Sequence, residues 1–535
     1  MTTDTPATQL AIPDLATGSA YLAALPLANP PLAEQRLIAF LDRLLAAPPD
    51  PGTLFALLEQ ARVPLRFVEE EMAKRYHNRP LVLSEQEDEI FRRVVSAWER
   101  MEKAYALCAR LQPPSDDSPQ YTTLIATIIH RCIYYMGMSI VEHFGARREI
   151  PSGVWHELHG YYATSEQWGV TFIPVSDALE NDLQATHCAA AYLTLLLIEI
   201  ASPYGRSIRD LNLIRRWAAM WSPLVSVHPV DDDYEIPPYI IDLGMDQPIF
   251  PAGSAHSIGP DARRLDTSRL GLQISHILTQ LHQRLTPSQL GLGNETSGHV
   301  IKLLERISGP WTQSSSARRF RRFTSEGSAN VAASINAIHF YISGKEFIQP
   351  DTSSAYSRSE FDLLYSFRDR AGGSQPMAIA PHGNYNVDEW SVINHSANGF
   401  RLARSHAGQK IEHNQLLAIR PDDGEYFLLA QVTWLMQEGT GGLVAGLSVL
   451  PGRPTACAVR IIEGGENAHT QRFARAFLLP AVAAINEGDS LVLPSGTYRV
   501  SAVLMIHEED KSWQVRMKHV IQRGIDFDRV SYESI

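Results

Sequence analysis

The sequence predicts a multidomain α + β fold: a large N-terminal all-helical domain, a small antiparallel β-barrel and a β-rich C-terminal region. The first reason is length, because 535 residues exceed what one domain usually holds. The second is the helical spacing of apolar residues from about residue 32 to residue 307. The third is an apolar period of two from residue 390 onward.

Composition and charge restrict the class of protein. Hydrophobic residues make up 44% and charged residues 20%, as is ordinary for a globular protein with a sizeable core. The net charge of −12 argues against broad binding of nucleic-acid polymers or anionic membranes, since both require a basic surface. The four cysteines are scattered without metal-ligand spacing. We therefore expect reduced thiols, no bound metal and a cytoplasmic location.

The N-terminus and the apolar segments favour a protein without membrane insertion. Residues 1–10 lack the basic and apolar regions of a secretory signal. The longest strongly apolar segment, 189–201, is interrupted by Glu199 and is shorter than the ~20 residues of a membrane span. We expect this segment to be a buried core helix.

Helices are predicted along most of the first 310 residues. Ser84 and Glu87 have the spacing of a capping box. The apolar residues that follow would lie on one face of a long helix: Phe91, Val94, Val95, Trp98, Met101, Tyr105 and Cys108. Further helices are predicted over 121–144, 178–201, 266–285 and 298–307. Residues 222–250 are rich in Pro and β-branched residues, which predicts a short hairpin or an irregular linker.

Changes in composition set the predicted domain boundaries. We expect a flexible lead-in over 1–30, a helical domain over 31–310, a barrel preceded by an arginine-containing linker over 311–452, and a second barrel or a barrel extension over 453–535. Within the first barrel, residues about 345–388 are rich in Ser, Gly, Pro and Asp, which predicts a long insertion.

Short period-two segments separated by Pro, Gly, Asp and Asn predict the strands of these barrels. The predicted strands are 390–394, 400–404, 415–420, 425–435, 443–450, 457–462, 473–479, 497–506 and 513–521, with a hairpin turn at 508–511.

Other clusters of chemically active residues carry weaker signals. His156 and His159 lack the spacing of a zinc-protease motif, so we interpret them as a helical surface pair. Neither a nucleophile elbow nor a phosphate-binding loop occurs in the sequence. We therefore expect that the protein is not an enzyme.

The most informative motif is the polar turn Asn394-His395-Ser396-Ala397-Asn398-Gly399 between two predicted strands. Upstream, Arg318-Arg319-Phe320-Arg321-Arg322 places four arginines in five residues of an otherwise acidic chain. An N-x-S-x-x-G turn preceded by R-x-x-x-R resembles the signature of PilZ domains, small β-barrels that bind the bacterial second messenger cyclic di-GMP. Gln431-Val432-Thr433-Trp434 and Gly446-Leu447-Ser448-Val449 resemble later strands of that family, so the resemblance covers about residues 318–452.

The resemblance implies cyclic di-GMP as the ligand, no other cofactor, and arginines as the main contacts. Arg318 and Arg322 have the i, i+4 spacing of the motif. A guanidinium pairs with the O6 and N7 atoms of guanine, stacks on a purine, or neutralises a phosphate. Arg319, Arg321 and Arg401 are secondary candidates.

The turn would supply the opposite wall of the site. Asn394 would pair with the polar edge of a guanine, and Ser396 would offer its hydroxyl to a base or a phosphate. Gly399 would give the turn a positive φ and let backbone N–H groups approach an anion. Asn394 lies 72 residues after Arg322, more than the family usually allows, and we attribute the excess to the predicted insertion. The family also has a first strand near 330–342, where the apolar spacing suits a helix instead.

Two functions of different classes follow. The first is a bacterial receptor for cyclic di-GMP, whose helical domain docks a protein partner and relays the signal to motility, pilus or biofilm machinery. The alternative is a ligand-independent scaffold with a degenerate PilZ domain. An enzyme in the helical domain is a weaker third hypothesis, because nothing there combines a nucleophile, a base and oxyanion donors at a recognisable spacing.

Overall fold

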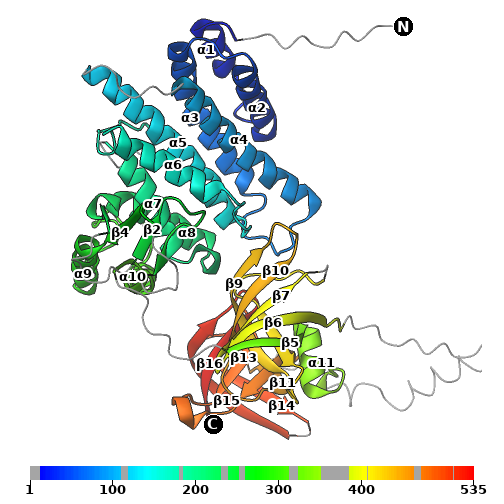
Figure 1. The fold of residues 1–535 in the computed structure, drawn as a ribbon. Coiled ribbons are helices and arrows are strands. Elements are labelled where there is room, and N and C mark those ends of the chain that lie inside the picture. Colours follow the sequence, from blue (N-terminus) through cyan, green and yellow to red (C-terminus); the bar gives the residue numbers. More distant parts are fainter. Residues whose placement is uncertain are drawn as a thin grey trace, which may run out of the picture. The chain divides into compact units, whose positions relative to one another are not determined.

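The computed structural model describes residues 12–109, 118–179, 185–230, 239–251, 259–312, 323–350, 385–405, 408–462, 472–509 and 511–535. The chain forms two compact units, Met1–Arg79 with Leu83–Arg318 and Pro80–Val82 with Arg319–Ile535. The predicted fold class is confirmed, since a helical region is followed by two closed six-stranded antiparallel barrels (Figure 1).

The first unit begins with four helices: α1 (Leu15–Ala23), α2 (Pro30–Ala46), α3 (Pro51–Ala73) and α4 (Glu85–Ala109). The side chains of Asp14, Asn29 and Asp50 cap the first three helices by accepting backbone N–H hydrogen bonds. The predicted capping box of α4 is confirmed, because the backbone N–H of Ser84 donates to Glu87 Oε2 at 2.8 Å.

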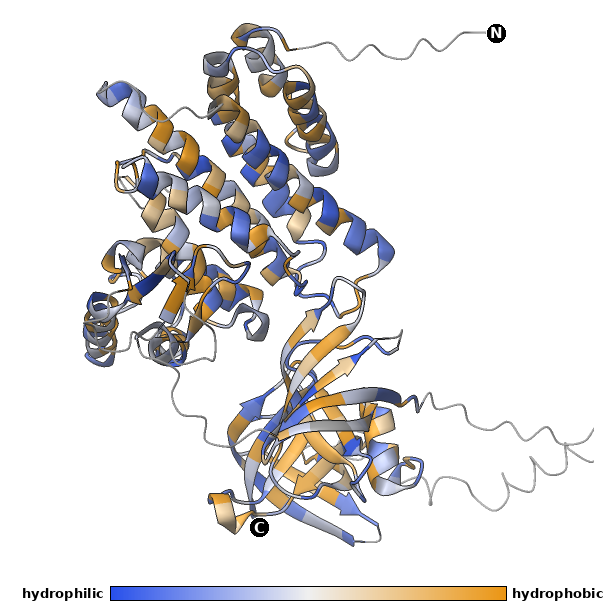
Figure 2. Cartoon of the chain, viewed as in Figure 1, coloured by the Kyte–Doolittle hydropathy of each residue, from blue (hydrophilic) through white to orange (hydrophobic). Residues whose placement is uncertain are grey.

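The apolar stripe predicted on α4 is buried. Trp98, Met101 and Tyr105 are at most 1% exposed. The side of this helix that is visible in Figure 2 is largely hydrophilic. The amphipathic pattern therefore predicted the buried face of the helix correctly.

The core of the first unit is built around α5 (Pro119–Gly145), which packs against α4, α6 (Val154–Gln167) and α7 (Cys188–Ile200). Among the described residues, α5 is long and apolar enough to cross a membrane, and 83% of its most apolar window is buried inside the structure. The helix predicted over 178–201 begins only at Cys188, where the His187 side chain provides the N-cap. Helix α8 (Ile208–Trp221) follows.

A small sheet occupies the region where the sequence suggested a hairpin or an irregular linker. Its strands are β1 (Ser226–Pro229), β2 (Tyr239–Asp242), β3 (Phe250–Pro251) and β4 (Ala262–Asp266), in the spatial order β1-β4-β2-β3. Helices α9 (Ser268–His282) and α10 (Ser297–Thr312) follow it and bury Leu270, Ile274 and Trp311 in the same core.

The first barrel has the strand order β10-β7-β6-β5-β8-β9. Its strands are β5 (Phe323–Ala332), β6 (Asp388–Ser396), β7 (Gly399–Arg404), β8 (Leu416–Pro421), β9 (Leu428–Gln437) and β10 (Leu443–Val449). Helix α11 (Ile335–Ser343) follows β5. The chain therefore forms first a strand, as the family pattern suggests, and then the helix that the apolar spacing near 330–342 suggests. Most of the predicted insertion lies outside the described residues.

The second barrel has the order β11-β12-β13-β16-β15-β14. Its strands are β11 (Thr455–Ile461), β12 (Ala474–Leu479), β13 (Ser490–Pro494), β14 (Val503–Glu508), β15 (Lys511–Arg523) and β16 (Phe527–Ser534). The predicted hairpin at 508–511 is confirmed by the pairing of Glu508 with Lys511. The strand predicted at 497–506 starts only at Val503, and the sequence analysis missed β13 and β16.

The two barrels share one apolar cluster within the second unit. Leu416 and Leu429 of the first barrel pack in the same cluster as Phe477 and Phe527 of the second. Leu416 also donates its backbone N–H to Asp526 Oδ1 at 2.9 Å. These contacts join the two barrels into a single body.

Candidate functional site

The polar turn closes a tight hairpin between β6 and β7. Ser396 pairs with Gly399, so only Ala397 and Asn398 lie between the strands. The Ser396 hydroxyl donates to Asn398 Oδ1 at 3.0 Å. The backbone N–H of Val449 donates to the Asn398 carbonyl at 2.9 Å. The Ser396 hydroxyl therefore already donates inside the turn, and toward a ligand it would act as an acceptor.

The positive φ predicted for Gly399 is wrong. Its φ is not in the left-handed region, which holds other glycines of the described chain. A Cβ at this position would lie 2.4 Å from the backbone oxygen of Leu447. Gly399 is therefore required because β10 approaches the backbone closely, and not because the turn needs positive φ.

A row of directly opposed residues runs across five strands of the first barrel. Thr324 of β5 pairs with Asn394 of β6, Asn394 with Arg401 of β7, Arg401 with Gly446 of β10, and Gly446 with Trp434 of β9. Directly opposed residues in antiparallel strands project to the same face of the sheet. The row therefore brings Asn394 and Arg401, which are far from Trp434 in sequence, to one surface.

This row lies on the outer face of the barrel. The next pair along the strands, Val392 with Leu402, is buried in the interior, whereas Asn394, Arg401 and Trp434 are partly exposed. The register shifts between Val392 and Asn394. One extra residue in a strand reverses the face to which the following side chains point, so this irregularity turns Asn394 outward.

Arg401 and Trp434 form the centre of the row. The Arg401 guanidinium carbon lies 5.6 Å from the Trp434 ring centroid. A Cβ on Gly446 would lie 1.9 Å from Trp434 Nε1, so the indole rests directly on the glycine. Arg401 Nε has no hydrogen-bond partner among the residues that the structure describes. The pair thus places a guanidinium group beside a flat aromatic ring, with the buried Nε–H of Arg401 left without a hydrogen bond.

Trp434 is a candidate site residue that the sequence analysis missed. Its only sequence signal was its place at the end of an apolar strand. Its position opposite Gly446 depends on the register of β9 with β10. That register could not be read from one sequence.

The predicted arginines Arg318, Arg319, Arg321 and Arg322 lie outside the described residues. Phe323, which follows Arg322 in the sequence, pairs with His395 of the polar turn motif. The two rings are 5.9 Å apart at their centroids. The first strand of the barrel thus begins beside the polar turn. The separation of 72 positions between Arg322 and Asn394 does not keep β5 from β6, because these strands are direct neighbours.

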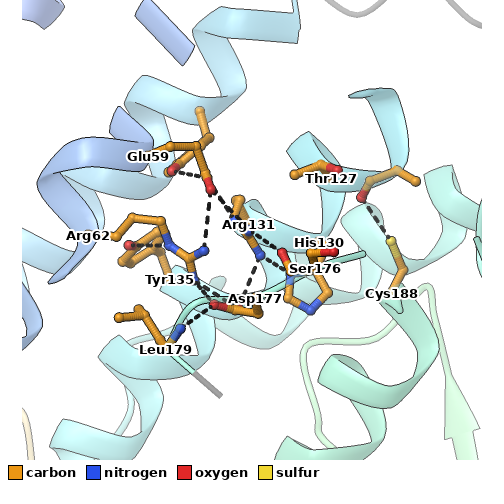
Figure 3. Close-up of polar contacts among 12 residues, drawn as sticks. Glu59, Arg62, Thr127, His130, Arg131, Tyr135, Ser176, Asp177, Leu179 and Cys188 are labelled. Carbon is orange, nitrogen blue, oxygen red and sulfur yellow. Dashed lines mark hydrogen bonds and ion pairs between the residues drawn. The ribbon is translucent and has the colours of Figure 1, made fainter. Parts of the chain in front are cut away.

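A second polar cluster is buried in the first unit (Figure 3). Asp177 accepts hydrogen bonds from Arg62 Nη2 at 2.8 Å and from Arg131 Nη1 at 3.1 Å. Arg131 Nε also donates to Glu59 Oε1 at 2.9 Å. Burial would raise the pKa values of both carboxyl groups, but the neighbouring guanidinium groups outweigh it and hold these pKa values below their usual range. The two charges of each sign balance, as is typical of a structural network.

The interpretation of His156 and His159 as a surface pair is wrong for His159. This ring is fully buried, and it contacts the Tyr192 hydroxyl at 2.7 Å and the Gln247 carbonyl oxygen at 2.8 Å. Both ring nitrogens are therefore satisfied within the core. Among the described residues, no group of three or more metal-binding side chains is assembled.

Comparison with known proteins gives three family matches in order along the chain. Residues 16–232 match "Cyclic-di-GMP receptor FimW, N-terminal domain", residues 239–370 match "Cyclic-di-GMP receptor FimW, middle PilZ domain", and residues 457–535 match "FimW C-terminal beta-barrel domain". The middle match includes the arginine cluster and ends before β6, so the polar turn lies outside it.

A curated relative is similar over most of the chain. The cyclic-di-GMP receptor FimW of Pseudomonas aeruginosa is 22% identical over 500 residues, which cover 85% of this chain and 80% of the relative. No solved structure matches the chain. The similarity therefore extends well beyond residues 318–452, to which the sequence motifs had limited it.

Proposed function

We propose that the chain belongs to the family of PilZ-domain receptors that these three family models represent, and that it binds cyclic di-GMP on the outer face of its first barrel. The binding module would be the first barrel together with the arginine-containing linker that precedes it, predicted over residues 311–452. The curated relative from Pseudomonas aeruginosa is a receptor for this messenger. We propose a binding protein and not an enzyme.

The row across the barrel supports particular roles for its side chains. The Asn394 amide carries both a donor and an acceptor for a guanine edge. Arg401 can neutralise a phosphate or pair with guanine while its plane stays near Trp434. Ser396 would accept a hydrogen bond and hold the turn. Gly399 would act through the packing of the turn against β10.

The observation that carries the proposal is the pairing of Phe323 with His395. Consecutive Cα atoms are about 3.8 Å apart, so Arg322 is covalently tethered near the polar turn. Arg318 precedes Arg322 by four residues, so an extended chain can place their Cα atoms up to roughly 13 Å apart, enough for the two side chains to reach opposite sides of a ligand. We propose that Arg318 and Arg322 close over a dinucleotide on the row, with Arg319 and Arg321 as secondary contacts.

Calorimetric titration of the full chain with cyclic di-GMP tests this proposal. We expect binding by the wild type and at least about tenfold weaker binding after Arg318→Ala, Arg322→Ala, Arg401→Ala or Asn394→Ala. Arg453→Ala is the matched control, since Arg453 stacks on Tyr426 elsewhere in the same unit at 4.6 Å from the ring centroid. If Arg318→Ala and Arg322→Ala both bind cyclic di-GMP as tightly as the wild type, the contacts proposed for these two arginines are wrong. No binding by the wild type would favour the ligand-independent scaffold.

We also propose a route by which the messenger reaches the helical unit. Pro80–Val82 belong to the second unit, although they lie between α3 and α4 in the sequence. Leu81 and Ile411 exchange backbone hydrogen bonds of 2.8 and 2.7 Å, and both side chains are 1% exposed. Two residues after Ile411, the His413 ring contacts the carbonyl oxygen of Thr433, next to Trp434.

A ligand that shifts Trp434 could thus shift the loop that joins α3 to α4. Motility, pilus or biofilm machinery would be the output, through a protein partner of the helical unit. Amide hydrogen exchange with and without cyclic di-GMP tests the route. We expect altered protection in α3 and α4 of the wild type, and loss of that change in Leu81→Ala at nearly unchanged affinity. The same change in both proteins would exclude this loop.

A further inference from the structure

The first unit contains a cavity of about 720 Å³ between α3, α5, α7 and α8. Sites for small molecules usually measure about 300–1,000 Å³ and combine an apolar lining with a few polar groups. All residues that line this cavity belong to the helical unit, so it shares no residue with the row on the first barrel. The site proposed for cyclic di-GMP therefore does not account for it.

The floor of the cavity is one stripe along α5. Side chains that recur every three or four positions lie on one face of a helix. The α5 residues that line the cavity have this spacing: His130, Ile133, Tyr134, Gly137, Met138, Val141, Glu142 and Gly145. Leu195 and Ile198 of α7 and Leu211 of α8 also line the cavity. From His130 to Val141 the stripe is roughly 16 Å long, and most of its side chains are hydrocarbon.

The cations of the lining already have partners. Glu70 Oε1 lies 3.0 Å from Arg66 Nε and 3.8 Å from Arg215 Nη2, so this carboxylate serves two arginines. Lys74 is paired with a neighbouring carboxylate of α3. Arg216 also has an interaction partner. An anionic ligand would therefore have to compete with groups of the protein for each of these cations.

The carboxylates of the lining are satisfied in the same way. Asp177 accepts hydrogen bonds from two buried arginines (Figure 3). Glu142 Oε2 accepts a hydrogen bond from the Tyr76 hydroxyl at 2.6 Å and contacts His77 Nε2 at 3.2 Å. A charged ligand of either sign would lose its hydration without gaining a free counter-charge. The cavity thus favours an uncharged molecule.

One buried donor at the end of the stripe is unused. The His130 side chain lines the cavity and is 2% exposed. Its Nδ1 lies 3.1 Å from Arg131 Nη1, which can only donate, so Nδ1 accepts and the ring proton resides on Nε2. In Figure 3 this second ring nitrogen lies on the side of the ring away from Arg131. No hydrogen bond joins Nε2 to another residue that the structure describes.

We propose that this cavity binds an uncharged, mainly apolar molecule with one carbonyl oxygen, such as a ketone or an ester. The carbonyl oxygen would accept a hydrogen bond from His130 Nε2, and the hydrocarbon part would lie along the α5 stripe between α7 and α8. This inference does not rest on cyclic di-GMP binding, because the two sites share no residue.

Calorimetric titration of the full chain with simple amphiphiles tests which charge and length the cavity accepts. 2-Decanone should bind with one molecule per chain. Decanoate and decyltrimethylammonium should bind at least about tenfold more weakly, because each would bury a charge without a free partner. 2-Heptanone should bind up to about 60-fold more weakly than 2-decanone, because it has three fewer methylenes. If either charged compound or the shorter ketone binds as tightly as 2-decanone, the proposal is overturned.

His130→Asn tests the donor. The asparagine oxygen can still accept from Arg131, but no N–H group remains at the position of Nε2. We expect 2-decanone to bind roughly 2- to 12-fold more weakly, which corresponds to one net hydrogen bond. Butylbenzene, which also has ten carbons but no oxygen, should bind equally to both proteins. Equal affinity of 2-decanone for both proteins, or an equal loss for both compounds, would overturn the role of His130.

Ala191→Phe tests the location. Ala191 of α7 lines the cavity and is half-buried, so a phenyl ring there would fill the cavity and abolish binding of 2-decanone and butylbenzene. Ala20→Phe, at an exposed position on α1, should leave both affinities unchanged. Wild-type affinity in a folded Ala191→Phe protein would overturn the site. If that variant does not fold, the comparison of the two compounds in His130→Asn decides the question.

Discussion

The Arg401 guanidinium carbon lies 5.6 Å from the Trp434 ring centroid, although 32 residues separate the two in the sequence. Both residues pair with Gly446 of the strand between them. A side chain at position 446 would occupy the space that the indole fills. The surface that we assign to the ligand therefore depends on one glycine, one aromatic ring and one arginine in register.

Trp434 should report ligand binding through its fluorescence. A guanine or phosphate that engages Arg401 changes the surroundings of the indole, so cyclic di-GMP should alter the emission of the wild type. Trp434→Phe should lose that change and bind the ligand about tenfold more weakly, because cation–π and stacking contributions reach roughly 0.5–2 kcal/mol. Trp513→Phe, at a half-buried position in the second barrel, should retain both signals. A Trp434→Phe protein with the full emission change would show that the ligand binds elsewhere.

Gly446→Ala should damage the same surface by moving the indole. The new Cβ would collide with Trp434 Nε1, so we expect a loss of about 1–3 kcal/mol in the free energy of unfolding and weaker cyclic di-GMP binding. Gly488→Ala is the control, because a Cβ there meets nothing within 4 Å. Chemical denaturation and calorimetry measure the two effects. Wild-type values for both would contradict the packing of Trp434 on Gly446.

The sequence predicted most strands of both barrels, and the misses have physical causes. Strands with an apolar period of two, such as β9 and β10, were found. The missed β16 (Phe527–Ser534) buries two charged side chains, Asp528 and Arg529, which break that pattern. Arg529 is compensated by Glu487 at 3.0 Å and by the Ser490 hydroxyl at 2.9 Å. The strands of the small sheet hold two to five residues, too few for any period to emerge.

The site was predictable only in part for a related reason. Asn394 and Ser396 could be proposed as site residues from the sequence, because a polar turn between two strands is a local signal. Trp434 joins the candidate site only through the pairing of β9 with β10 and of β10 with β7. The register shifts of these strands change which face a side chain occupies, and a sequence pattern does not determine such shifts.

Asp177→Asn should strongly destabilise the helical unit. The carboxylate neutralises Arg62 and Arg131, whose side chains are 2% and 1% exposed, and the amide would leave two buried cations with one carboxylate. Removing one partner from a buried charge network typically costs about 3–5 kcal/mol. Glu71→Gln, which breaks an exposed pair with Lys74, should change the free energy of unfolding by less than about 1 kcal/mol. Denaturation followed by the helical circular dichroism signal measures both, and equal effects would contradict the role of the network.

His130 should make the helical unit less stable as the pH falls from 6.5 to 5. Its Nδ1 lies 3.1 Å from Arg131 Nη1, which can only donate, so the folded state requires a neutral ring. Burial, followed by the charge of Arg131, lowers the pKa of His130 to about 3 from an ordinary value of 6.5. Below pH 6.5 the unfolded chain therefore binds a proton that the folded chain excludes. The expected loss in the free energy of unfolding is about 2 kcal/mol at pH 5.

His130→Asn should remove this dependence, because its side-chain oxygen can accept from Arg131 at every pH. The difference in the free energy of unfolding between wild type and variant, followed from pH 6.5 to 5, isolates the histidine. Burial raises the pKa values of Glu102 and Glu199 to about 7, and these groups titrate in both proteins, so their contributions cancel in the difference. His276→Asn, at an exposed position on α9, should keep the wild-type slope. Parallel curves for wild type and His130→Asn would show that the buried ring accepts a proton without cost, against the geometry of its contact with Arg131.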